Sequence, residues 1–152
     1  MARHLFNGYR WMSPILRQGR YWFDMPRYAE EAKLSLAAVG AAEDERLEMA
    51  VQAVEVVWDI FDAGYAHCDL HADNLFWVGG RIVVIDFETM QAYPPGARLA
   101  FPLSYDITGR GMPPPFKMVS RPCYTAGPAN LEDTLGVPAG IAVAGAAARR
   151  GC

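Results

Sequence analysis

The sequence predicts an α+β fold, because short strand-like segments and one long amphipathic helix occur in the same 152-residue chain. Three segments carry this prediction: an aromatic-rich stretch at 5–25, a helical pattern at 43–63 and a hairpin pattern at 75–87. With 52% hydrophobic and 20% charged residues, the chain can bury a real core, and its length suits one domain.

Residues 5–16 and 20–25 are expected to form two short strands joined at Gln18-Gly19, since Tyr, Trp and Phe suit a half-buried pleated surface. The aromatic side chains of this stretch are expected in the core rather than on a ligand-stacking surface. They are Trp11, Tyr21, Trp22 and Phe23.

The segment 43–63 is expected to be the main helix. Its apolar residues recur at alternating spacings of four and three, which draws one core-facing stripe along a helix. Three acidic residues begin the segment, where the helix dipole favours negative charge, and Gly64 follows its end as a left-handed cap. The stripe consists of Leu47, Val51, Val54, Trp58 and Phe61.

A Gly79-Gly80 turn separates the strand-like runs 75–78 and 81–87 and predicts a tight hairpin. The run 82–85 reads Ile-Val-Val-Ile, which is apolar on both faces and predicts a buried strand. Beyond residue 90 the composition changes, and 17 of the 25 Gly and Pro residues lie in the last 62 positions. That part is expected to be rich in loops.

The net charge of −3 argues against a general nucleic-acid binder. The N-terminus has no apolar run typical of a secretion signal, and no segment approaches the roughly 18 to 20 apolar residues of a membrane span. The three cysteines match no zinc or disulfide spacing. We therefore expect a cytoplasmic protein with reduced thiols and neither nucleic-acid nor membrane partners.

The stretch HCDLHADNLFWVGGRIVVIDFE, at 67–88, carries the chemistry. Asp69 follows the main helix on a loop, where a carboxylate can accept a proton from a hydroxyl. Asn74 and Asp86, one on each side of the hairpin, offer neutral and anionic oxygen ligands that suit Mg²⁺ with bound phosphates. A base or positioning group beside a metal ion that binds phosphates is the arrangement that enzymes use for phosphoryl transfer.

The order H-x-D-x-x-x-x-N, hairpin and I-D-F resembles the protein-kinase-like superfamily. His71 and Glu88 stand where protein kinases have Lys and Gly, and this variant looks most like the aminoglycoside phosphotransferase and choline kinase branch. Asp73 and Glu88 lie beside the motif without an assigned role. Asp106 is a weak match to the family's buried Asp that anchors the catalytic loop.

The resemblance implies four residue roles. Asp69 would be the catalytic base, and His67 would brace the catalytic loop. Asn74 and Asp86 would bind Mg²⁺ and so hold ATP. The reaction implied is ATP-dependent phosphoryl transfer to a hydroxyl of a small molecule.

The resemblance also implies a protein-kinase-like architecture in two parts. Residues 1–28 would be a remnant of the small-lobe β-sheet with the hinge, and residues 29–152 the large catalytic lobe. Within that lobe, 67–74 would be the catalytic loop and 82–88 the metal-binding strand end.

The sequence departs from the kinase pattern where ATP phosphates are held. It contains no G-x-G-x-x-G, and its two lysines, Lys33 and Lys117, do not match the strand lysine. The chain is therefore expected to be truncated: a fragment of a longer kinase, an altered gene product, or a relative without a small lobe. The rival function is a catalytically inactive, pseudokinase-like interaction module. Small-lobe aromatics left exposed would favour self-association or a partner.

Two other interpretations of the motif stay open. Its Asp and Asn residues could be ordinary turn residues, which bond their own backbone. Alternatively, HCDLH could be a zinc site with His and Cys ligands. The zinc hypothesis involves His67, Cys68, His71 and Asp73, with His4 as the remaining histidine.

Overall fold

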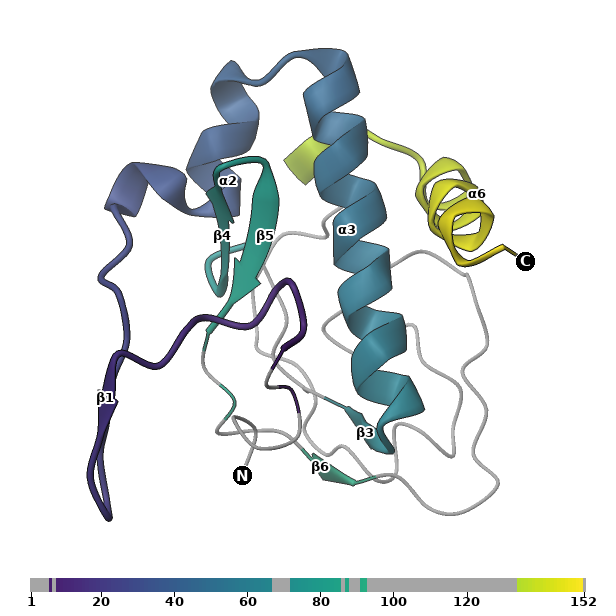
Figure 1. Ribbon diagram of the computed structural model, residues 1–152. Coiled ribbons are helices and arrows are strands. Elements are labelled where there is room, and N and C mark those ends of the chain that lie inside the picture. The colour runs from purple at the N-terminus through teal and green to yellow at the C-terminus, as the bar shows by residue number, and fades with distance from the viewer. Residues whose placement is uncertain are drawn as a thin grey trace.

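A computed structural model describes residues 6, 8–66, 72–85, 87, 91–92 and 134–151 (Figure 1). It confirms the α+β class, with helices and small antiparallel sheets. The strands are β1 (Arg17–Gln18), β2 (Phe23–Asp24), β3 (Tyr65–Ala66), β4 (Leu75–Val78), β5 (Arg81–Val84) and β6 (Gln91–Ala92). The α-helices are α2 (Leu34–Ala37), α3 (Glu43–Asp62) and α6 (Ala139–Arg150), with short 3₁₀ turns η1 (Glu30–Ala32) and η2 (Ala38–Gly40).

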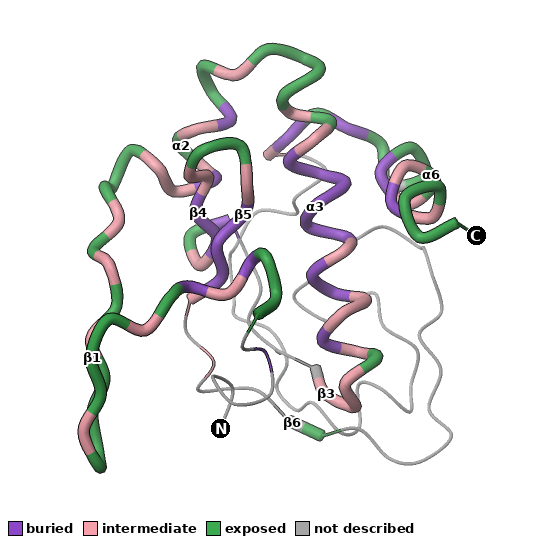
Figure 2. The backbone as a smooth tube through the Cα atoms, viewed as in Figure 1, coloured by how far each residue is buried: buried purple, intermediate pink, exposed green. Residues whose placement is uncertain are grey.

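Helix α3 is the centre of the core and confirms the predicted main helix. Acidic residues occupy its first turn, and Gly64 follows it with φ +94°, as the cap prediction requires. The predicted single stripe is too narrow, because β5 and α6 lie along different sides of the helix (Figure 2). Leu47 is 37% exposed instead of buried, although it belongs to the stripe. The buried residues are Met49, Ala50, Val51, Gln52, Ala53, Val54, Val56, Val57 and Ile60.

The β4–β5 hairpin is confirmed in place and in its turn. Its register pairs Leu75 with Val84 and Val78 with Arg81. Gly79 and Gly80 have φ of +59° and +78°, and two positive values are what a type I′ turn needs. Ile82, Val83 and Val84 are at most 1% exposed, which confirms the buried strand over these residues. Strand β5 is shorter than the predicted 81–87, and Ile85, beyond its end, is only partly buried.

The N-terminal strands are much shorter than expected. Pairing is limited to β1 with β2, and residues 8–16 form turns with one parallel bridge, between Met12 and Val84. The core prediction holds for Trp11, at 5% exposed. It is wrong for Tyr21, Trp22 and Phe23, at 86%, 54% and 50% exposed. The reason is that the β1–β2 hairpin projects from the body, and no other strand in the described ranges pairs with it (Figure 1).

Helix α6 was not predicted from the sequence, and it packs beside α3 (Figure 1). Its small residues permit close approach: a Cβ at Gly145 would lie 2.7 Å from Cγ2 of Val51. Arg149 pairs with Glu48 and, at 3.0 Å, with Glu55 of α3. The Ala and Gly of α6 give little apolar contrast along the sequence, so this helix depends on its neighbour rather than on a pattern of its own.

No helix in the described part of the chain has both the length and the apolar content to cross a lipid bilayer.

Candidate functional site

Two small antiparallel ladders frame the stretch that carries the motif. Strand β3 pairs with β6, so Ala66, which precedes His67, lies opposite Gln91. The β4–β5 hairpin lies between these strands in the chain, and Asn74 directly precedes β4. Backbone pairing therefore holds the chain directly before the motif and shortly after it.

The open end of the hairpin pairs Asn74 with the residue that precedes Asp86 in the sequence. The backbone N–H of Ile85 donates to the carbonyl of Asn74 at 3.2 Å, which extends the β4–β5 ladder by one pair. Ile85 is bonded to Asp86, the second predicted ligand. Asn74 and the residue preceding Asp86 are thus direct neighbours across the hairpin.

Asp73, next to Asn74, has a structural partner in helix α2. Its carboxylate accepts a hydrogen bond from the Ser35 hydroxyl at 2.7 Å. Nearby, Lys33 donates to Glu30 at 2.8 Å, and this hydrogen bond is the main reason that the pKa of Lys33 is raised above 10.5. The charge of Asp73 adds a smaller effect in the same direction. No sequence pattern pointed to this α2 contact.

Gln52 of α3 is a second residue that the sequence did not single out. Its side chain is buried and accepts the backbone N–H of Ile82 at 2.8 Å. It also donates to the carbonyl of Gly80 at 3.0 Å and to Glu48 at 2.8 Å. No sequence signal pointed to this role, because Gln52 continues the polar row of Glu48, Glu55 and Asp59 along the helix. The fold buries its amide, and a buried amide needs partners. Gln52 fixes the hairpin, and hence Asn74, against α3.

The remaining predicted site residues lie outside the described part of the chain. These are His67, Asp69 and Asp86 of the predicted site, Cys68, His71 and His4 of the zinc hypothesis, and Glu88 and Asp106. Within the described ranges, no three His, Cys, Asp or Glu side chains gather as a metal-binding group. The zinc and turn interpretations therefore stay as hypotheses.

The predicted donors fit Mg²⁺ by their chemistry. Asn74, which directly precedes β4, would offer an amide oxygen, and Asp86, which follows β5 by two residues in the sequence, would offer a carboxylate. Hard oxygen donors are what Mg²⁺ selects.

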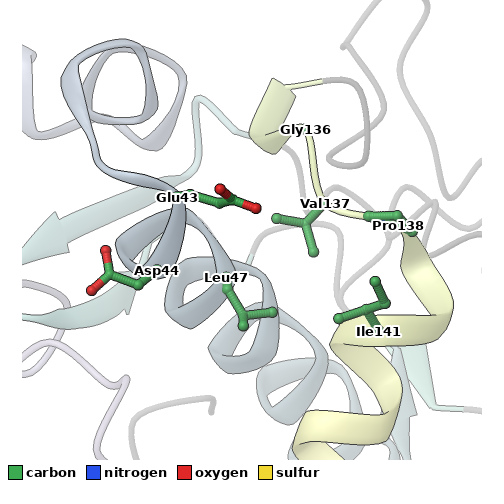
Figure 3. A pocket seen from close by; sticks show the side chains of 7 residues that line it. All are labelled: Glu43, Asp44, Leu47, Gly136, Val137, Pro138 and Ile141. Carbon is green, nitrogen blue, oxygen red and sulfur yellow. The ribbon is translucent and has the colours of Figure 1, made fainter.

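A separate hollow of about 490 Å³ lies between the start of α3 and the start of α6 (Figure 3). Leu47 and Ile141 lie across from one another there, and Glu43 and Asp44 supply its charge. Gly136, Val137 and Pro138 complete the lining. None of these residues belongs to the hairpin, so the hollow is distinct from the motif.

The comparisons with known proteins agree with this architecture. The model of a phosphotransferase enzyme family matches residues 10–116. Among solved structures, the fold is similar to the Cydia pomonella granulovirus kinase PK-1, with a TM-score of 0.50 and 15% sequence identity. That match covers 65% of this chain and 39% of the viral kinase, so the chain spans well under half the length of its structural relative. A comparison with curated proteins gives no match.

The family match begins before Trp11 and continues past the β4–β5 hairpin, so it includes the whole motif at 67–88. The structural match independently supports the arrangement of helices and small sheets. The chain therefore belongs to the phosphotransferase enzyme family and has a protein-kinase-like α+β fold.

Proposed function

We propose that the protein is an ATP-dependent phosphotransferase that acts on a hydroxyl of a small molecule. The observation that carries this proposal is the pairing of Asn74 with Ile85, the residue before Asp86, at the open end of the hairpin. This pairing supports the proposal because, in a chain of the phosphotransferase family, it sets Asn74 beside the residue that precedes the second predicted Mg²⁺ ligand.

Each residue has a distinct role in the proposed reaction. The Asp69 carboxylate orients the acceptor hydroxyl and takes its proton, and His67 braces the loop that carries Asp69. Asn74 and Asp86 hold Mg²⁺. When bound, the metal would supply positive charge that offsets the negative charge of the ATP phosphates.

The direct test is transfer of label from [γ-³²P]ATP to a panel of aminoglycosides, choline-like alcohols and sugars. We expect Mg²⁺-dependent labelling of at least one class, and Asp69→Asn should abolish it while the far-ultraviolet circular dichroism stays unchanged. Asp44→Asn is the matched control, because Asp44 is an exposed carboxylate in the first turn of α3, outside the motif, and its variant should retain activity. Turnover by Asp69→Asn equal to the wild type would remove Asp69 from the mechanism.

A second candidate is a catalytically inactive, kinase-like interaction module. The sequence feature that favours it is the absence of a G-x-G-x-x-G and of a matching strand lysine, the groups that hold ATP phosphates in kinases. The same assay separates the two proposals. A folded protein that neither binds MgATP nor transfers phosphate would support the module.

A further inference from the structure

Trp11 lies where the N-terminal segment meets strand β5. Its side chain is 5% exposed, and its backbone carbonyl accepts the N–H of Val84 at 2.9 Å. Met12 forms a parallel bridge with the same Val84. Because the N–H of the next residue, Ile85, bonds to the carbonyl of Asn74, the end of β5 is held from both sides.

The ring of Trp11 also contacts the chain just beyond the predicted metal ligand. Its centroid lies 6.3 Å from that of Phe87 and 5.0 Å from that of Phe6. Phe6 in turn stacks on Phe87 at 6.0 Å. Trp11 therefore contacts the strand two residues before Asp86 and the ring one residue after it.

A partly buried hydrogen bond fixes the orientation of Trp11. Its indole Nε1 donates to Oδ2 of Asp59 on α3 at 2.9 Å. The other carboxylate oxygen of Asp59 accepts from Arg150 of α6 at 2.9 Å. Arg150 is itself held by Asp62 at 2.7 Å and lies 4.9 Å from the ring of Trp58. One carboxylate thus connects the last turn of α6 to the tryptophan beside β5.

We propose that Trp11 and Asp59 are positioning residues for the end of β5, from which the chain continues to Asp86, and that Arg150 couples helix α6 to this strand end. The inference rests on the proposed function, because it concerns the same predicted Mg²⁺ ligand. Groups that orient metal ligands from the second layer usually change metal affinity about 10- to 100-fold when they are removed.

Two arginines of α6 provide a matched pair of variants. Arg149 and Arg150 are adjacent, and both pair with carboxylates of α3. Arg150 contacts Asp59, whereas Arg149 pairs with Glu48 and Glu55. Arg149→Gln and Arg150→Gln therefore remove similar ion pairs between the same helices, and only Arg150→Gln removes the contact with Asp59.

The first measurement tests the contacts from Arg150 through Asp59 and Trp11 to Val84 without any ligand. It uses amide hydrogen exchange and the indole N–H resonance of Trp11 in nuclear magnetic resonance spectra. Trp11→Phe, which keeps a ring and loses the N–H, should lower protection at Val84 about tenfold, the effect of losing a hydrogen bond to a charged group. Asp59→Asn keeps an acceptor and should cause a smaller loss. Arg150→Gln should shift the Trp11 indole resonance, and Arg149→Gln should leave it in place. Equal effects of the two arginine variants, or unchanged protection at Val84 in Trp11→Phe, would overturn the proposal.

The second measurement is the affinity of the same variants for Mn²⁺ with ATP, by electron paramagnetic resonance. Trp11→Phe should weaken Mn²⁺ binding about tenfold or more, and Arg149→Gln should match the wild type. Wild-type affinity in Trp11→Phe would show that the tryptophan only packs the core. If the wild type itself binds no Mn²⁺ with ATP, the proposed function fails, while the exchange data still decide whether Trp11 and Asp59 fix the end of β5.

Discussion

Gln52→Met replaces a buried amide that holds the β4–β5 turn against α3 with an apolar side chain of similar length. The substitution removes the acceptor of the Ile82 N–H, and Ile82 is completely buried. The carbonyl of Gly80 also loses its donor, but Gly80 is exposed and can bond to water. The cost therefore comes mainly from one unsatisfied buried N–H.

An unsatisfied buried donor costs about 1–3 kcal/mol, so we expect the free energy of unfolding to fall by about 2 kcal/mol. With a urea dependence of about 2 kcal/mol per molar, the unfolding midpoint should fall by about 1 M. Amide exchange at Ile82 should accelerate in parallel, because that N–H loses its protein partner.

The assay is urea unfolding followed by circular dichroism, with Gln18→Met as the matched control. Gln18 lies in β1 with an exposed side chain, so the same substitution there should change stability by less than about 0.5 kcal/mol. A loss below about 0.5 kcal/mol in Gln52→Met, or an equal loss in Gln18→Met, would refute the role of Gln52.

Three further predictions test other contacts. The hydrogen bond from Arg149 is the main reason that the pKa of Glu48 lies below 4.5. The ion pair between these residues therefore stabilises the fold fully above pH 4.5, and this stabilisation is lost as the pH falls through the folded-state pKa of Glu48. Urea unfolding of Arg149→Gln should therefore show a deficit at pH 7 that shrinks below pH 4.5, and a deficit independent of pH would contradict this. Gly145→Ala should lower the free energy of unfolding by about 1–3 kcal/mol in thermal unfolding, because the added Cβ would overlap the side chain of Val51 on α3. Gly140→Ala, with open space around its Cβ, should be neutral or stabilise by up to about 1 kcal/mol, and the reverse order would exclude close packing of α6. We also propose that the exposed hairpin aromatics support self-association: sedimentation velocity should show concentration-dependent association that Trp22→Ser weakens, and a monomeric wild type would contradict it.

Local signals in the sequence were sufficient where one short segment determines its own structure. Gly79 and Gly80 take the positive φ that their turn requires, and Gly64 ends α3 as a left-handed residue. The order of the motif around the hairpin was sufficient to identify the family that the comparisons show. These features depend on spacing and backbone conformation, which a single sequence records directly.

Features that depend on a neighbour could not be predicted in the same way. Leu47 continues the apolar spacing of α3 and is still partly exposed, because the neighbours of that helix cover it unevenly. Tyr21 has the same strand-like context as Trp11, and only the fold distinguishes the buried ring from the exposed one. Gln52 and Asp59 bond to partners 30 and 91 residues away, and no local pattern encodes such contacts.

Binding of MgATP is the most direct test of the proposal that this chain carries a phosphotransferase site. In a thermal unfolding titration, ATP with Mg²⁺ should raise the melting temperature, by the equivalent of about 1.4 kcal/mol at ten times the dissociation constant. ATP with EDTA should have a smaller effect, and Asn74→Ala and Asp86→Ala should reduce the Mg²⁺-dependent part. An unchanged melting temperature at millimolar MgATP would contradict nucleotide binding by this chain.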